Sequence, residues 1–229
     1  MLRPAKLTPY VRSKSGASDM SDNQVRLDEI TNAALERFRA KHGVRERAIQ
    51  LSREVIRTSA NAIRAIHRNE LEQAKTQVDA AGALVAETRD ILEGHADLYF
   101  TGYTQDAQKE YAEARCVYAF ISAVEAPTPD DMGIETASYL NGLAEAASEL
   151  RRYILDSLRR DDDSRSEELM QLMDDVYNVL VVMDFPDALT GGLRRTTDQL
   201  RAVLERTRGD LTMTTRQRRL ERLLAEHEQ

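Results

Sequence analysis

The sequence has few cysteines, prolines, glycines and aromatic residues, and each shortage narrows the possible fold classes. A single cysteine, Cys116, excludes an intramolecular disulfide and a cysteine-based zinc site. Ten glycines and five prolines in 229 residues leave the body of the chain short of helix breakers. With no tryptophan, the apolar residues suit helices packed through Leu, Ala and Val better than a β-sandwich. No apolar run reaches the length of a membrane span and no signal peptide is apparent, so we expect a cytoplasmic protein that does not interact with membranes.

Acidic residues moderately outnumber basic ones, which gives the chain a net charge of −7. This balance argues against indiscriminate binding of nucleic acid over the whole surface, but local basic patches remain compatible with it. Arginines recur along one side of the segment 53–68 and are dense after residue 193. We predict that Arg53, Arg57, Arg194 and Arg195 contact RNA phosphates, which gives salt-dependent binding. The alternative for each arginine is an ion pair with one of the many Asp and Glu residues.

The spacing of apolar residues predicts an all-α fold, a bundle of successive helices without strands. Residues 1–21 are polar and aperiodic, and we expect them to be disordered, with residues 22–229 forming one all-helical domain. The expected helices cover residues 22–41, the segment from 44, and residues 70–92, 104–125, 130–159 and 164–183. Further helices follow a break at Phe185 and Pro186. Gly43 and Gly94 mark two of the expected helix ends.

Two carboxylates interrupt the apolar stripe of the expected helix 104–125. The stripe runs through Tyr103, Ala107, Glu110, Ala114, Val117, Ile121 and Val124. Glu110 takes a core position and Glu113 lies one turn further, so both point into roughly the same volume. Like charges on an apolar face are costly unless they are protonated, paired with arginine or bound to a cation. Because Mg²⁺ and Mn²⁺ prefer oxygen ligands, the pair is a candidate metal site. An ion pair with Arg57 or Arg115 is the alternative.

A second pair, Glu145 and Glu149, lies one turn apart on the expected helix 130–159. These residues are opposite the apolar stripe of that helix, which by itself indicates an ordinary solvated face. A ferritin-like di-iron centre would need Glu-x-x-His pairs. None of the histidines at positions 42, 67, 95 and 227 follows a glutamate of these two helices by three residues, which excludes that centre. No histidine is placed to act as a general base.

Several segments resemble the translin family, and within it the branch of translin-associated factor X. The segment QKEYAEA at residues 108–114 resembles that branch's acidic helix, Q-E-[FY]-x-E-A. The segment YLNGL at 139–143 resembles Y-L-x-G-[LV]. The most specific stretch spans residues 184–211 and resembles D-[YF]-P-D-A…L-R-R-x-T-D…L-E-[KR]-T-R-G-D-L. The resemblance covers residues 44–212.

The resemblance implies a seven-helix, translin-type fold whose subunits assemble into a hollow shell around RNA or single-stranded DNA, with a homo-octamer or homo-hexamer expected. The factor X branch is a Mg²⁺-dependent endoribonuclease with acidic side chains facing the interior. Its helix-four glutamates match Glu110 and Glu113. Its Asp-x-x-x-Glu falls on Glu145 and Glu149. The resemblance thus replaces the solvated-face interpretation of these two residues, because in a hollow shell the non-core face of a helix can line the lumen. Position 145 is Glu where the branch has Asp, which changes the ligand geometry.

We therefore expect an oligomeric endoribonuclease that cuts short or single-stranded RNA. Glu110, Glu113, Glu145 and Glu149 would be both its catalytic residues and its ligands for Mg²⁺ or Mn²⁺. One alternative is a translin-like protein that binds RNA or single-stranded DNA without cutting it. The other is a purely structural helical protein with these carboxylates in ion pairs. We interpret Cys116 as a small buried residue rather than a nucleophile.

Overall fold

The computed structural model describes residues 22–227, and its backbone contacts divide the chain after Gly43 into two units. Within these residues it has nine helices and no strand, which confirms the predicted all-α class. The helices are α1 (Asp22–His67), α2 (Leu71–Ile91), α3 (Ala96–Tyr99), α4 (Tyr103–Ser122), α5 (Pro129–Met132), α6 (Thr136–Leu158), α7 (Ser166–Val181), α8 (Asp187–Thr190) and α9 (Leu193–His227). Three of the nine, α3, α5 and α8, are only four residues long. The disorder expected for residues 1–21 lies outside the described residues. Between residues 22 and 227, no helix is both long and apolar enough to cross a bilayer.

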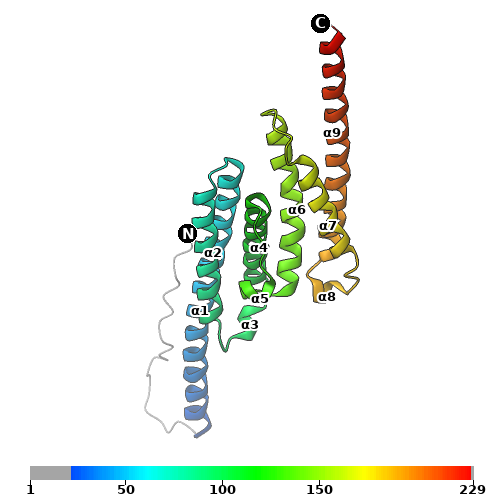
Figure 1. Cartoon of the computed structure of the whole chain (residues 1–229). Coiled ribbons are helices and arrows are strands. Elements are labelled where there is room, and N and C mark those ends of the chain that lie inside the picture. The colour runs from blue at the N-terminus through cyan, green and yellow to red at the C-terminus, as the bar shows by residue number, and fades with distance from the viewer. Residues whose placement is uncertain (1–21, 228–229) are drawn as a thin grey trace. The chain divides into compact units, whose positions relative to one another are not determined.

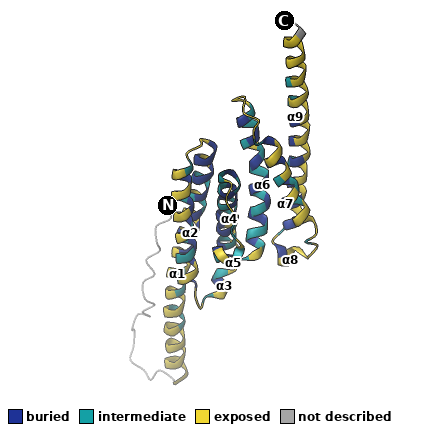
Figure 2. Cartoon of the chain, in the orientation of Figure 1, coloured by how far each residue is buried: buried dark blue, intermediate teal, exposed yellow. Residues whose placement is uncertain are grey.

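The helix break that we expected near Gly43 is absent, because α1 continues from Asp22 to His67. A single glycine costs a helix only about 1 kcal/mol relative to alanine, and no proline stops the chain here. Burial nevertheless changes along α1. Residues 22–43 are mostly exposed, whereas buried side chains begin at Ala48 and recur along the helix to His67 (Figure 2). The start of the second unit therefore coincides with the start of the apolar stripe.

In the second unit, α4 and α6 are the central helices. Helix α2 packs on α4, and α7 and α9 pack on α6 and on each other (Figure 1). The main hydrophobic core joins all of these helices with the C-terminal end of α1, and it includes Ile66, Val117, Leu150, Ile154 and Leu169. Each such side chain contributes roughly 1.5–3 kcal/mol when fully buried. Val124, predicted in the stripe of α4, is 54% exposed because α4 ends at Ser122.

The helix expected at 130–159 is split into the short α5 and the long α6. Thr128 caps α5 and Gly133 ends it with a φ of 62°, a left-handed conformation that glycine adopts without strain. The aromatic connector before α4 contains α3. The Tyr99 hydroxyl donates a hydrogen bond to Glu135 over 3.0 Å, and the Gln108 amide donates to that hydroxyl over 2.9 Å. These bonds fix the start of α4 beside the start of α6.

Asn141 connects α6 to the C-terminal helices. Its side-chain amide donates to the Thr190 carbonyl over 2.8 Å, and its oxygen accepts from the Thr196 hydroxyl over 2.6 Å. The amide is 5% exposed, so these bonds satisfy polar atoms that water cannot reach. The YLNGL segment therefore holds α8 and α9 on α6. In the described part of the chain, two helices follow the Phe185–Pro186 break, as expected: the short α8 and the long α9, which runs unbroken from Leu193 to His227.

A candidate metal centre between α4 and α6

The backbones of α4 and α6 approach each other closely at Gly142. A Cβ atom on this glycine would lie 2.5 Å from the Lys109 carbonyl oxygen, 2.7 Å from the Ala112 Cβ and 2.9 Å from the Glu113 nitrogen. Real Cβ atoms do not come this close to backbone atoms, so only glycine fits without movement of the helices. The close approach brings the acidic residues of α4 within reach of α6.

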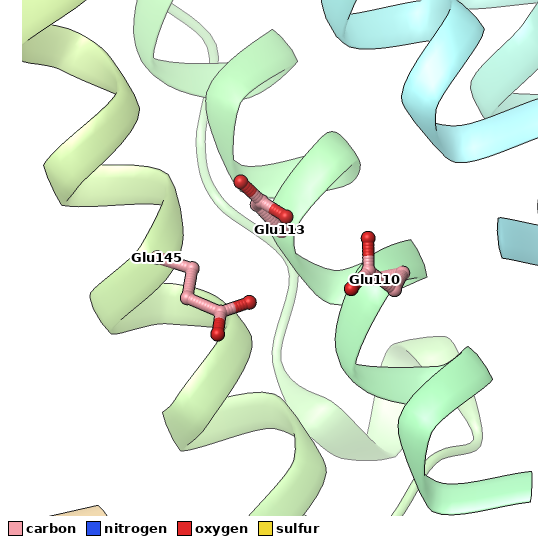
Figure 3. A group of neighbouring side chains, drawn as sticks. All are labelled: Glu110, Glu113 and Glu145. Atoms are coloured by element: carbon pink, nitrogen blue, oxygen red, sulfur yellow. The ribbon is translucent and has the colours of Figure 1, made fainter. Parts of the chain in front are cut away.

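Three carboxylates converge in the space that results. Glu110 and Glu113 extend from α4, and Glu145 reaches towards them from α6 (Figure 3). One carboxylate oxygen from each residue lies within 4.8 Å of the others, and each residue is partly buried. Two oxygens on opposite sides of a Mg²⁺ ion are about 4 Å apart, because each Mg–O distance is about 2.0–2.1 Å. A small adjustment of the side chains would therefore let one cation contact all three oxygens.

Lys109 neutralises part of this charge. Its ammonium group lies 3.2 Å from the Glu110 Oε1 atom and also pairs with the Glu145 Oε2 atom, so it bridges the two helices. The side chain is 24% exposed. The carboxylate partners keep the pKa of Lys109 above its ordinary value although burial opposes the shift. Lys109 is therefore charged at neutral pH.

Glu113 is the carboxyl group most affected by its surroundings. Burial, and then the charges of Glu145, Glu110 and Glu149, raise its pKa to about 8, while Lys109 acts in the opposite direction. Glu113 therefore holds a proton at neutral pH when no cation is bound. The proton and the ammonium of Lys109 together offset most of the negative charge that converges here.

Glu149 is held from a different side. The His67 Nε2 atom lies 2.6 Å from the Glu149 Oε1 atom, and the Arg152 guanidinium lies 3.6 Å from the same oxygen. The side chain of His67 is only 4% exposed. A histidine that the sequence did not single out therefore contacts one of the acidic residues. His67 ends α1 and lies 82 positions before Glu149, so no signal in the sequence indicates this contact.

The predicted arginine partners of the helix-four glutamates pair elsewhere. Arg57 lies 3.2 Å from Glu54, and Arg115 lies 3.3 Å from Asp79. Glu110 is nevertheless in an ion pair, as the alternative to a metal site proposed, but its partner is Lys109 rather than an arginine. Glu145 and Glu149 are partly buried, at 33% and 26% exposed, so they lie on neither a fully solvated face nor the apolar core.

The four arginines predicted to bind phosphate are exposed and lie on two helices. Arg53 and Arg57 are on α1, and Arg194 and Arg195 are near the start of α9. Arg194 pairs with Asp184. Arg194 and Arg195 line an open pocket together with Asp187 and Asp198, so acidic groups accompany the basic ones.

Comparison with known proteins identifies similar chains. No protein-family model matches the chain. An uncharacterized protein of Methanocaldococcus jannaschii, MJ0175, is 29% identical over 189 residues, which are 82% of this chain and 83% of that protein. Among solved structures, AfC3PO is 29% identical with a TM-score of 0.77, and the match covers 82% of this chain and 98% of AfC3PO.

Two further structures extend the comparison. The complex of AfC3PO with duplex RNA matches with a TM-score of 0.72 at 29% identity, over 82% of this chain and 97% of the other. NeC3PO without ligand has the same fold, with a TM-score of 0.68 at 19% identity, over 86% of this chain and all of the other. The chain therefore has the translin-type helical fold of the C3PO structures, and at 29% identity it is similar in sequence to AfC3PO.

Proposed function

We propose that this chain is a translin-family endoribonuclease of the factor X branch. It would act in the cytoplasm as a homo-oligomeric shell, hexameric or octameric, and cut short or single-stranded RNA with Mg²⁺ or Mn²⁺. The observation that carries the proposal is the convergence of Glu110, Glu113 and Glu145, whose oxygens lie within 4.8 Å of one another. Such a set of hard oxygen donors suits these cations.

RNA is the favoured substrate for two reasons. AfC3PO, which is 29% identical to this chain, has been solved in complex with duplex RNA. The exposed arginines Arg53, Arg57, Arg194 and Arg195 would contact the sugar–phosphate backbone, which requires no particular base sequence.

The four acidic residues would have different roles in binding the cation and in proton transfer. Glu110, Glu113 and Glu145 would hold the cation, and Glu149, fixed by His67, would complete the set from the next turn of α6. When bound, the cation would supply positive charge to the scissile phosphate and make a water molecule more acidic. One of the glutamates would then accept a proton from that water molecule as the general base.

A cleavage time course tests the proposal. Labelled single-stranded RNA would be incubated with the purified protein in Mg²⁺, in Mn²⁺ and in EDTA, beside a Glu110→Ala/Glu113→Ala variant. A matched control changes two exposed glutamates outside the site, Glu167→Ala/Glu205→Ala. We expect metal-dependent cleavage by the wild type and the control, and none by the site variant. Cleavage in EDTA, or equal cleavage by a site variant of unchanged oligomeric mass, would contradict the proposal.

A non-catalytic shell that binds RNA or single-stranded DNA is the second candidate. The observation in its favour is Lys109, which offsets part of the charge of Glu110 and Glu145 without any metal ion. A salt-sensitive gel shift without cleavage in any cation would support this candidate. A purely structural helical protein would give no gel shift even at low salt.

A further inference from the structure

The ammonium group of Lys109 occupies the position between two of the converging carboxylates. Lys109 precedes Glu110 on α4, yet its side chain reaches across to Glu145 on α6. In the described residues, the ion pairs recorded for Glu110 and Glu145 are both with this lysine. The contact is mostly shielded from water, since the lysine side chain is 24% exposed and the two carboxylates are 29% and 33% exposed.

A positive charge at this position has two effects. It allows the carboxylates to lie close together when no metal is present, because it offsets their mutual repulsion. It also uses the oxygens that a divalent cation would need. A divalent cation and an ammonium group separated by about 4 Å repel each other strongly in a partly buried site, so both cannot bind the same carboxylates favourably.

We infer that Lys109 is a built-in counter-ion that competes with the divalent cation for Glu110 and Glu145, and that it leaves them when the cation binds. The inference rests on the proposed metal centre and adds a residue that the proposed ligand set does not contain. The competition lowers the affinity for the cation and keeps the empty centre assembled. The displaced amine, on its flexible four-carbon chain, then becomes accessible to solvent.

The first test measures Mn²⁺ affinity of the full-length protein by titration calorimetry, with no RNA present. Lys109→Met and Lys109→Gln remove the charge while keeping a long side chain. Lys75→Met is the matched control, because Lys75 also pairs with a carboxylate, Asp79 at 2.8 Å, but lies on α2 outside the site. We expect both Lys109 variants to bind Mn²⁺ more tightly than the wild type, on the order of tenfold, and the Lys75 variant to be unchanged.

The second test uses the wild type alone, so it does not depend on how the variants fold. A limiting amount of an amine-reactive reagent is added with and without Mg²⁺, and the modified lysines are quantified by mass spectrometry. We expect the modification of Lys109, relative to that of Lys75, to increase several-fold in Mg²⁺.

The outcomes separate the inference from the metal centre itself. Equal or weaker Mn²⁺ binding by folded Lys109 variants, or unchanged modification of Lys109 in saturating Mg²⁺, would overturn the competition and leave the metal centre standing. If neither the wild type nor any variant binds Mn²⁺ or Mg²⁺, the metal centre and the competition both fail.

Discussion

The Nε2 atom of His67 lies 2.6 Å from a carboxylate oxygen of Glu149, although the two residues are 82 positions apart in the chain. The other ring nitrogen, Nδ1, is buried and has no hydrogen-bond partner among the described residues. A neutral ring that donates from Nε2 fits both facts, because Nδ1 then carries no proton that needs an acceptor. His67 therefore orients Glu149 as a hydrogen-bond donor from inside the core.

Replacing His67 by leucine should destabilise the protein by about 1–2 kcal/mol, because Glu149 loses its buried donor. His67→Gln keeps a donor of similar reach and should recover most of that loss. Urea unfolding of both variants measures the difference. If leucine and glutamine variants are equally stable, the hydrogen bond contributes nothing to stability and the packing of the ring is what matters.

The stability of the metal-free protein should depend on pH through Glu113. Its pKa is about 8 in the folded chain and about 4.5 when the chain is unfolded, so the folded state holds the proton over the interval between these values. Stability from this group is complete below pH 4.5 and is lost as the pH rises towards 8. Glu113→Gln cannot ionise and should therefore be more stable than the wild type by roughly 2–4 kcal/mol at pH 9, with little difference at pH 4.5.

Unfolding curves in EDTA at several pH values test this expectation. The matched control is Glu72→Gln, a change of an exposed glutamate on α2. A stability difference for Glu113→Gln that stays the same from pH 4.5 to pH 9 would show that the proton on Glu113 has no part in it.

Gly142→Ala should separate α4 from α6. The added methyl group would meet the Lys109 carbonyl at 2.5 Å, so the helices must move, which costs about 1–3 kcal/mol. Mn²⁺ affinity should also fall, because Glu145 moves away from Glu110 and Glu113. The control is Gly209→Ala on α9, where a Cβ meets nothing within 4 Å. Alanine there should stabilise the helix by about 0.5–1 kcal/mol, and thermal unfolding with Mn²⁺ titration compares the two. Unchanged affinity in a folded Gly142 variant would contradict the role of the close approach.

Arg194→Ala and Arg195→Ala together should weaken binding to single-stranded RNA and reduce its dependence on salt. Each lost phosphate contact lowers the slope of log K against log salt by about 0.7. Arg195 should account for more of the effect, since Arg194 already pairs with Asp184. Fluorescence anisotropy at several salt concentrations measures the slope. The same slope before and after the double change would assign RNA binding to other residues.

The helical fold could be predicted because few residues interrupt the helices and the apolar stripes are regular. The apolar stripe of α6 is an example, since its residues Leu150 and Ile154 are fully buried. Two of the errors lie at glycines, whose effect depends on backbone conformation. Gly43 continues α1, whereas Gly133, with a positive φ, separates α5 from α6. Residue type alone does not distinguish these two situations.

The acidic residues were only partly accessible to prediction from the sequence. Glu110 and Glu113 stand out because they interrupt an apolar stripe, while Glu145 and Glu149 required the resemblance to a known family. Lys109 gave no signal, because its contact with Glu145 depends on the distance between two helices. His67 gave none for a related reason, since its partner lies on a helix that comes much later in the chain.

The contact between Gly142 and Ala112 has a consequence for which ions the centre would accept. The spacing of the carboxylates depends on how closely two helices approach, and the residues that control this approach are not ligands. Enlarging the small side chain at Ala112 would widen the centre and favour larger ions, while every acidic group stayed unchanged. In the proposed metal centre, selectivity for ion radius would therefore depend on two small residues of the helix–helix contact, Gly142 and Ala112, that are not ligands themselves.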